Sequence, residues 1–242
     1  MQAAGKTDVG NIRENNEDVL YLSIDPIGSL PNLFLVADGM GGHRAGEIAS
    51  QSAMQFFLEY IKENSCSDGE LLDYMAEGVK YANNAVFKLS LADPTYFGMG
   101  TTLTVCVISD QKVLIAHIGD SRIYLASDGK LQQLTNDHTF VSEMVRAGQF
   151  SKEEAERHPS KNALTRALGV DHDVSADAPM AAVTTGDMLL LCSDGLSNMV
   201  PEEDIEEILK SDKNVEAKAT ALIERAKKNG GLDNITVIVI DV

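Results

Sequence analysis

The sequence contains no tryptophan, and only 5% of its 242 residues are aromatic, so a core would have to be built mainly from aliphatic side chains. The chain has three cysteines, Cys66, Cys106 and Cys192, which are far apart and form no Cys-x-x-Cys pair. Because Cys106 and Cys192 lie inside apolar runs, we expect them to be buried free thiols. This pattern excludes a disulfide framework and favours a reducing, cytoplasmic location.

Basic residues are also scarce: 20 lysines and arginines face 37 acidic residues, a formal net charge of −17. Nucleic acids and anionic membranes bind basic surfaces, so this balance excludes both as expected partners. The N-terminus lacks the apolar segment of a signal peptide, and no run approaches the ~20 apolar residues of a membrane span. Since 44% of the residues are hydrophobic, the chain has enough material for a core, and we expect a monomer.

The chain has no low-complexity segment, linker or internal repeat, which predicts one domain over residues 1–242. Helical periodicity and capping signals predict helices over 45–63, 67–91, 201–209 and 215–228. Short apolar runs predict strands over 19–24, 33–37, 101–108, 113–118, 122–127, 130–134, 188–192 and 235–240. Tight turns join neighbouring strands and strict β-α-β alternation is absent, so we expect an α+β fold of two packed, mainly antiparallel sheets with helices outside.

Acidic residues fall at the ends of the most apolar strands. Asp38 follows the run 33–37, Asp120 follows 113–118, Asp194 follows 188–192 and Asp233 precedes 235–240. A further pair, Glu17-Asp18, precedes the strand at 19–24.

A carboxylate at the edge of a core is costly unless it is paired or binds a metal. A single such aspartate is most often a cap or turn residue, but five acidic points at one kind of position favour a shared site. If the strand ends converge, divalent Mg²⁺ or Mn²⁺ bound by oxygen would offset the repulsion. Glycines in Asp38-Gly39 and Asp194-Gly195 would permit sharp turns beside such ions.

Six motifs occur along the chain in this order: Arg13-Glu14-Asn15-Asn16-Glu17-Asp18, Val36-Ala37-Asp38-Gly39-Met40-Gly41-Gly42-His43, Gly100-Thr101-Thr102, Gly119-Asp120-Ser121-Arg122, Cys192-Ser193-Asp194-Gly195 and Asp233-Asn234-Ile235-Thr236. Taken together, they resemble the metal-dependent type 2C (PPM) protein serine/threonine phosphatases in their compact bacterial form. The resemblance covers essentially the whole chain. It implies a four-layer αββα sandwich, two central sheets flanked by helix pairs, with a flap at about 139–169 beside the active site.

The resemblance also implies a role for each acidic residue. Asp38 would bridge two Mn²⁺ or Mg²⁺ ions, with Glu17 and the carbonyl of Gly39 on one ion. Asp194 and Asp233 would hold the other. Asp120, together with Asp194, would hold a third, weaker ion, and Asp18 would orient the water.

Arg13 would bind the phosphate in this reading. Water activated by two dications would attack phosphoserine or phosphothreonine directly, and Arg13 would offset charge in the transition state. The substrates would be phosphorylated proteins, among them a cognate bacterial serine/threonine kinase. Two alternatives stay open: a stress- or sporulation-type regulatory phosphatase of the same superfamily, and a non-catalytic, metal-stabilised pseudophosphatase.

The leaving alkoxide must be protonated, which requires a general acid. His43 is a candidate general acid, although relatives carry this histidine directly after Asp-Gly and here it is displaced by three residues. His117 lies on an apolar strand and is expected to be a satisfied core residue, whereas His138, His158 and His172 are expected to be solvated. Arg166 would either contact the site or form a structural ion pair.

Overall fold

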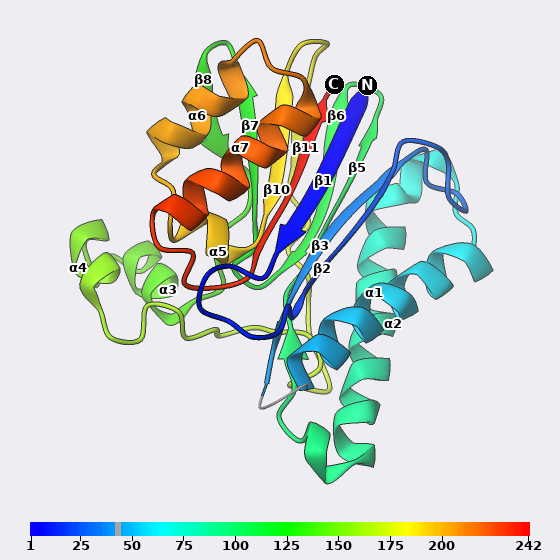
Figure 1. Ribbon diagram of the computed structural model, residues 1–242. Coiled ribbons are helices and arrows are strands. Elements are labelled where there is room, and N and C mark those ends of the chain that lie inside the picture. Colours follow the sequence, from blue (N-terminus) through cyan, green and yellow to red (C-terminus); the bar gives the residue numbers. More distant parts are fainter. Residues whose placement is uncertain (42–44) are drawn as a thin grey trace.

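The computed structural model describes residues 1–41 and 45–242, and these form two β-sheets packed face to face with helices on both outer faces (Figure 1). This four-layer α+β arrangement is the fold class expected from the sequence. In the described part of the chain, no helix is long and apolar enough to cross a membrane.

The first sheet has the strand order β1-β11-β10-β7-β8, and the second has the order β2-β3-β5-β6-β9, with β4 paired to β3. Every strand pairing in both sheets is antiparallel. The strands are β1 (Gln2–Asp8), β2 (Asp18–Ser23), β3 (Leu33–Met40), β4 (Gly100–Thr101), β5 (Leu103–Ser109), β6 (Lys112–Ile118), β7 (Arg122–Ser127), β8 (Lys130–Gln133), β9 (Met180–Ala182), β10 (Met188–Cys192) and β11 (Ile235–Asp241).

Helices α1 and α2 cover the second sheet, and α6 and α7 cover the first. Two short helices, α3 and α4, project from one end of the sandwich (Figure 1). The helices are α1 (Ala45–Glu63), α2 (Leu71–Ala92), α3 (Phe140–Arg146), α4 (Lys152–Arg157), α5 (Asp194–Ser197), α6 (Glu202–Lys210) and α7 (Val215–Lys228), with 3₁₀ turns at Asp68–Glu70 and Pro94–Tyr96.

The apolar runs of the central strands are continuous because both faces of each sheet are buried. In β3, Phe34 and Val36 point between the sheets, while Leu33, Leu35 and Ala37 pack under α1 and α2. In β10, likewise, Leu189 and Leu191 lie between the sheets and Leu190 faces α6 and α7. Cys106 and Cys192 are buried free thiols in these layers, as expected.

The two predicted hairpins are confirmed, and their turns explain why. Asp110 and Gln111 both have positive φ between β5 and β6, and Asp128 and Gly129 do so between β7 and β8. This is the conformation that matches the right-handed twist of paired strands.

Strand β1 has no counterpart in the sequence prediction, because the segment Gln2–Asp8 lacks an apolar run. It forms by pairing along its whole length with β11. A Cβ at Gly5 would lie 2.8 Å from Cδ2 of Leu22, so the small residue lets this edge strand pack against the other sheet.

The expected turns at Asp38-Gly39 and Asp194-Gly195 are wrong. Strand β3 continues through Asp38 and Gly39, and Asp194 and Gly195 begin helix α5. The glycines serve close packing instead. A Cβ at Gly39 would lie 2.1 Å from the carbonyl oxygen of Gly46, and one at Gly195 would lie 1.9 Å from that of Asn234.

Candidate active site

Five of the predicted aspartates meet at one end of the sandwich. Asp18 and Asp38 face each other across the β2–β3 pair. Asp120 follows β6, Asp194 opens α5 directly after β10, and Asp233 stands just before β11. The charges of the other four aspartates all raise the pKa of Asp38, which shows that the strand ends converge. We call these five residues the acidic cluster.

The acidic cluster is electrostatically costly. Burial, followed by the neighbouring carboxylates, raises the pKa of Asp18 to about 7 and that of Asp120 to about 8. The same causes raise the pKa of Asp194 to about 6 and hold that of Asp38 well above its ordinary value. Carboxylates in this state attract a multivalent cation, because a cation removes both the burial penalty and the mutual repulsion.

Ser193 connects the two sheets inside the acidic cluster. Its hydroxyl donates to Oδ2 of Asp18 at 2.7 Å and accepts the amide hydrogen of Thr236 at 3.0 Å. The other oxygen of Asp18, Oδ1, is buried and has no hydrogen-bond partner within the described residues. Oδ1 of Asp18 is therefore available to bind a group that does not belong to the described residues.

Glu17 lies at the edge of the acidic cluster, against the start of α1. A Cβ at Gly46 would lie 2.6 Å from the Glu17 carboxyl group, so a side chain at this position would displace that carboxyl group. The Glu17 backbone N–H donates to the side-chain oxygen of Asn234, and its carbonyl oxygen accepts from the Gly39 N–H and the Ser50 hydroxyl. Burial raises the pKa of Glu17, as in the acidic cluster.

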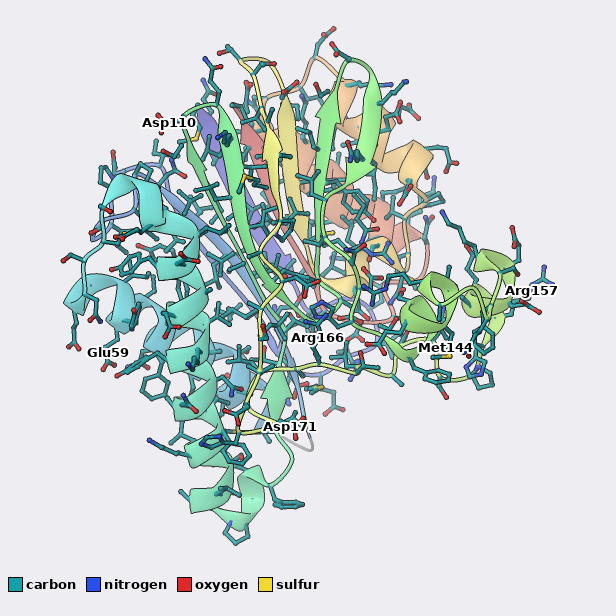
Figure 2. All side chains as sticks on the ribbon, turned by 180° about the vertical axis from the view of Figure 1, so that it is seen from behind. Glu59, Asp110, Met144, Arg157, Arg166 and Asp171 are labelled. Carbon is teal, nitrogen blue, oxygen red and sulfur yellow. The ribbon has the colours of Figure 1, made fainter. Side chains whose placement is uncertain are left out.

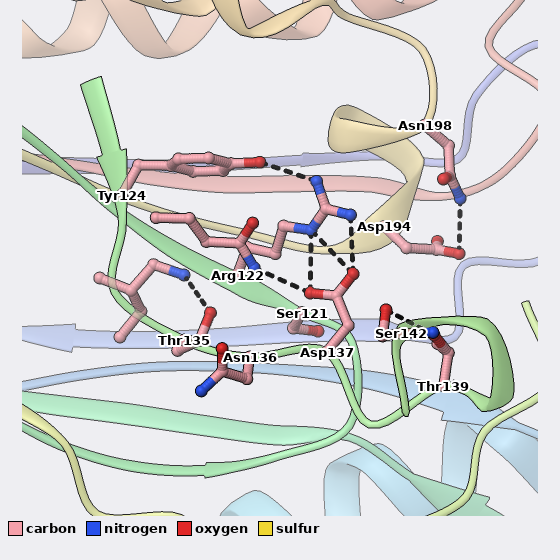
Figure 3. A network of polar contacts seen from close by, with 12 residues as sticks. Ser121, Arg122, Tyr124, Thr135, Asn136, Asp137, Thr139, Ser142, Asp194 and Asn198 are labelled. Atoms are coloured by element: carbon pink, nitrogen blue, oxygen red, sulfur yellow. Dashed lines mark hydrogen bonds and ion pairs between the residues drawn. The ribbon is translucent and has the colours of Figure 1, made fainter. Parts of the chain in front are cut away.

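Arg13 pairs with Asp233, Nη2 to Oδ2 at 2.8 Å, and 52% of its side chain remains exposed. The guanidinium therefore reaches the acidic cluster and still presents donors to solvent. Arg122 is not available in this way, although it is close to Asp120 in sequence. It forms a forked ion pair with Asp137 and donates to the hydroxyl of Tyr124, as Figure 3 shows.

Supporting residues were missed by the sequence reasoning. Asn198 donates to Oδ2 of Asp194 at 2.9 Å from one turn further along the chain (Figure 3). The Asn234 side chain donates to the carbonyl oxygens of Val9 and Asn15, which fixes the loop that carries Arg13. Asn234 belongs to the motif at 233–236, but the motif does not indicate that the side-chain amide of Asn234 joins two chain segments.

The structure confirms the predicted burial state of some histidines and contradicts that of others. His43 lies outside the described residues. His117 is a satisfied core residue as predicted, with Nδ1 bonded to the Thr104 hydroxyl and Nε2 to the Asn136 carbonyl. The expectation for His138 is wrong: its side chain is fully buried beside Asp177, because the polar segment around it folds over the strand ends.

The donor set of the acidic cluster fits hard divalent cations such as Mg²⁺ or Mn²⁺, since its members are all carboxylates and one of their buried oxygens is unpartnered. Among the described residues, no three His, Cys, Asp or Glu side chains converge closely enough to hold an ion alone. Water or backbone oxygens would thus complete the coordination, as is usual for Mg²⁺.

Comparisons with known proteins identify the family of the chain. Residues 13–232 match the family model of protein phosphatase 2C. The chain is 42% identical to the serine/threonine phosphatase stp of Listeria monocytogenes, over 100% of this chain and 96% of that protein. The crystal structure of the Mycobacterium tuberculosis serine/threonine phosphatase PstP/Ppp has 40% identity and a TM-score of 0.89, covering 100% of this chain and 98% of that one.

A structure of the PstP catalytic domain in complex with two manganese ions is 39% identical, with a TM-score of 0.86 over 99% of this chain and 97% of that one. The fold and the comparisons together define a phosphoprotein phosphatase. The chain belongs to the protein phosphatase 2C family.

Proposed function

We propose that this phosphatase hydrolyses phosphoserine and phosphothreonine in proteins at the acidic cluster, loaded with two Mn²⁺ or Mg²⁺ ions. The observation that carries the proposal is the convergence of five aspartates, of which Asp18 is buried and has one unpartnered oxygen. The relatives named serine/threonine phosphatases and the manganese complex of PstP support it.

The residues would divide between the ions by position. Asp38, at the centre of the acidic cluster, would bridge both ions, with Glu17 and the Gly39 carbonyl beside one. Asp194 and Asp233 would hold the other ion. Among the neighbouring charges, that of Asp194 raises the pKa of Asp120 the most. These two residues would share a third, weaker metal site.

When bound, the two cations supply hydroxide from water near neutral pH and offset the charge of the phosphoryl group. Asp18 orients the attacking water through the unpartnered Oδ1, while Ser193 holds Oδ2. Arg13 holds the phosphoryl oxygens with the donors that its pair with Asp233 leaves exposed. The transition state gains charge on these oxygens, so the same contact strengthens as the reaction proceeds.

Residues 139–169, with α3 and α4, would form a flap within a single catalytic domain and help to choose substrates. Phe140, Phe150 and His158 pack against one another away from the sandwich core, which makes this segment a small unit of its own. Amide hydrogen exchange tests this: we expect faster exchange in 139–169 than in β5 and β10, and equal protection would contradict a mobile flap.

We place the enzyme in the cytoplasm as a monomer that reverses the action of a serine/threonine kinase. The two buried free thiols support a reducing compartment. Size-exclusion chromatography with light scattering tests the monomer, and a stable dimer at micromolar concentration would contradict it. A non-catalytic pseudophosphatase is disfavoured because the predicted acidic residues are all present and the relatives are named as enzymes.

The deciding experiment is Mn²⁺-dependent hydrolysis of a phosphothreonine peptide. Asp38→Asn and Asp233→Asn should each lower kcat at least a hundredfold, since each removes an oxygen ligand of the ions. Asp212→Asn, an exposed aspartate remote from the acidic cluster, is the matched control and should behave as wild type. Full activity in excess chelator, or undiminished activity in both cluster variants, would overturn the proposal.

A further inference from the structure

His138 is a fully buried histidine outside the acidic cluster, and the proposed reaction makes no use of it. Its backbone amide donates to the carbonyl oxygen of Gly119 at 2.8 Å. In return, the amide of Gly119 donates to Nδ1 of the His138 ring at 3.1 Å. The ring and backbone of one residue therefore hold the residue that directly precedes Asp120.

These contacts define which ring nitrogen carries the proton. A backbone amide can only donate, so Nδ1 of His138 must be the acceptor and Nε2 must carry the hydrogen in the neutral ring. Nε2 lies 3.2 Å from Oδ2 of Asp177, within range of electrostatic attraction, but it has no hydrogen-bond partner within the described residues. Burial lowers the pKa of His138, which keeps the ring neutral near pH 7.

The turn that His138 holds is tightly fitted on its other side as well. Gly119 has a φ of +108°, and a Cβ at this position would lie 2.4 Å from Cγ2 of Thr102. The backbone is thus confined between Thr102 and His138. The direction in which Asp120 leaves this turn depends on both neighbours.

Asp177 connects His138 to the end of the 139–169 segment. Its Oδ1 accepts from Nη1 of Arg166 at 2.7 Å, and its backbone exchanges two hydrogen bonds with His117 on β6. The amide of Thr165 donates to the His138 carbonyl at 2.8 Å. Figure 2 shows Arg166 at this junction, below the sheets and between helix α2 and the α3–α4 segment. Of the two roles open to Arg166, the structure shows the ion pair.

We propose that His138 is a positioning residue for Asp120: its Nδ1 fixes the Gly119–Asp120 turn, and the carboxylate of Asp177, held by Arg166, lies beside the other ring nitrogen. The inference rests on the proposed function, in which Asp120 is a cation ligand. It further means that the imidazole of His138 is one of the links between the flap and the acidic cluster. Groups that orient a metal ligand typically change metal affinity about 10- to 100-fold when they are removed.

The first test is spectroscopic and is read out on the wild-type protein. In the Mg²⁺-loaded protein at pH 7, long-range ¹H–¹⁵N NMR should show His138 as the neutral tautomer with hydrogen on Nε2. The signal is assigned by its loss in His138→Asn. A hydrogen on Nδ1, or on both nitrogens, would overturn the inference, since Nδ1 could then not accept from Gly119.

The second test separates the two ring nitrogens. An asparagine oxygen lies near the position of histidine Nδ1, and a glutamine amide nitrogen lies near that of Nε2. His138→Asn should retain the Gly119 contact and bind Mn²⁺ within about threefold of wild type. His138→Gln should lose it, weaken the weakest Mn²⁺ binding step at least about tenfold and lower kcat, with KM for p-nitrophenyl phosphate unchanged.

Mn²⁺ binding is measured by electron paramagnetic resonance without substrate, so this result is independent of turnover. Equal weakening in both variants would mean that the ring only fills space, and wild-type binding in His138→Gln would remove its role. If neither variant folds, as judged by circular dichroism, Asp177→Ala serves instead because Asp177 is partly exposed. It should weaken Mn²⁺ binding severalfold, and wild-type binding would overturn the inference. Failure of the proposed function itself would show differently, as wild-type activity in excess chelator.

Discussion

The hydroxyl of Ser193, at the end of β10, donates to Oδ2 of Asp18, at the start of β2, across a distance of 2.7 Å. This bond joins the two sheets at the point where the aspartates meet. It also leaves Oδ1 as the oxygen of Asp18 that has no hydrogen-bond partner within the described residues. The alignment of the two halves of the sandwich and the orientation of one carboxylate thus depend on the same hydroxyl.

Replacing Ser193 with alanine should lower both stability and activity. The buried amide of Thr236 would lose its acceptor and Asp18 its donor, which costs about 1–3 kcal/mol in the free energy of unfolding. Urea denaturation measures this loss, and steady-state kinetics should show a lower kcat. Ser211→Ala is the control, since it removes a hydroxyl bonded to the Ile208 carbonyl at the end of α6. Equal effects in both variants would mean that the sheet junction has no special role.

Asp38→Asn should make the metal-free protein more stable while it abolishes activity. The substitution removes one of several buried carboxylates that repel one another, for a gain of at least about 1 kcal/mol at pH 8 in chelator. Saturating Mn²⁺ should stabilise wild type by about 3 kcal/mol at 100 times the Kd, and the variant by much less. Thermal unfolding with and without metal measures both, and a metal-free variant less stable than wild type would contradict the repulsion.

His117 should make the protein sensitive to mild acid. Burial lowers its pKa to about 4, from an ordinary value of 6.5. The unfolded chain therefore takes up a proton first, so the stability present above pH 6.5 is lost as the pH falls toward 4. At pH 5 this amounts to roughly 2 kcal/mol.

The contribution of His117 is isolated by comparing wild type with His117→Asn, which retains an acceptor near Nδ1 for the Thr104 hydroxyl. Urea denaturation between pH 7 and pH 5 should show a flatter decline in the variant, although the variant is less stable at pH 7. Parallel pH profiles for the two proteins would show that the imidazole does not titrate between these pH values.

Arg13→Ala should raise KM for phosphopeptides about tenfold and leave the free energy of unfolding nearly unchanged. KM rises because the forked donor for phosphate is lost. The free energy of unfolding changes little because a half-exposed ion pair contributes little to stability. Arg157→Ala, on the exposed surface of α4, is the control. An unchanged KM in Arg13→Ala would remove the arginine from the phosphate site.

The strands that carry the acidic cluster could be predicted because their residues are buried on both faces, as in 33–37, 188–192 and 235–240. The aspartates at their ends stood out for the same reason, since charge beside such runs is costly. Strand β1 could not be predicted, because Gln2–Asp8 is ordered only by its pairing with β11. The glycines of Asp38-Gly39 and Asp194-Gly195 lie beside the acidic cluster as predicted, but they permit close packing of the backbone and not sharp turns.

The sequence by itself determined the two antiparallel sheets, the acidic strand ends and the family, because hydrophobic runs, turn residues and motif order are local properties. Tertiary structure alone decided how the side chains are shared. It paired Arg122 with Asp137 rather than with the acidic cluster and set Arg13 against Asp233. It also buried the side chain of His138, a residue of a polar segment, between the Gly119 amide and the Asp177 carboxylate. Such contacts join residues that are distant in the chain, and their energies depend on burial that no local pattern records.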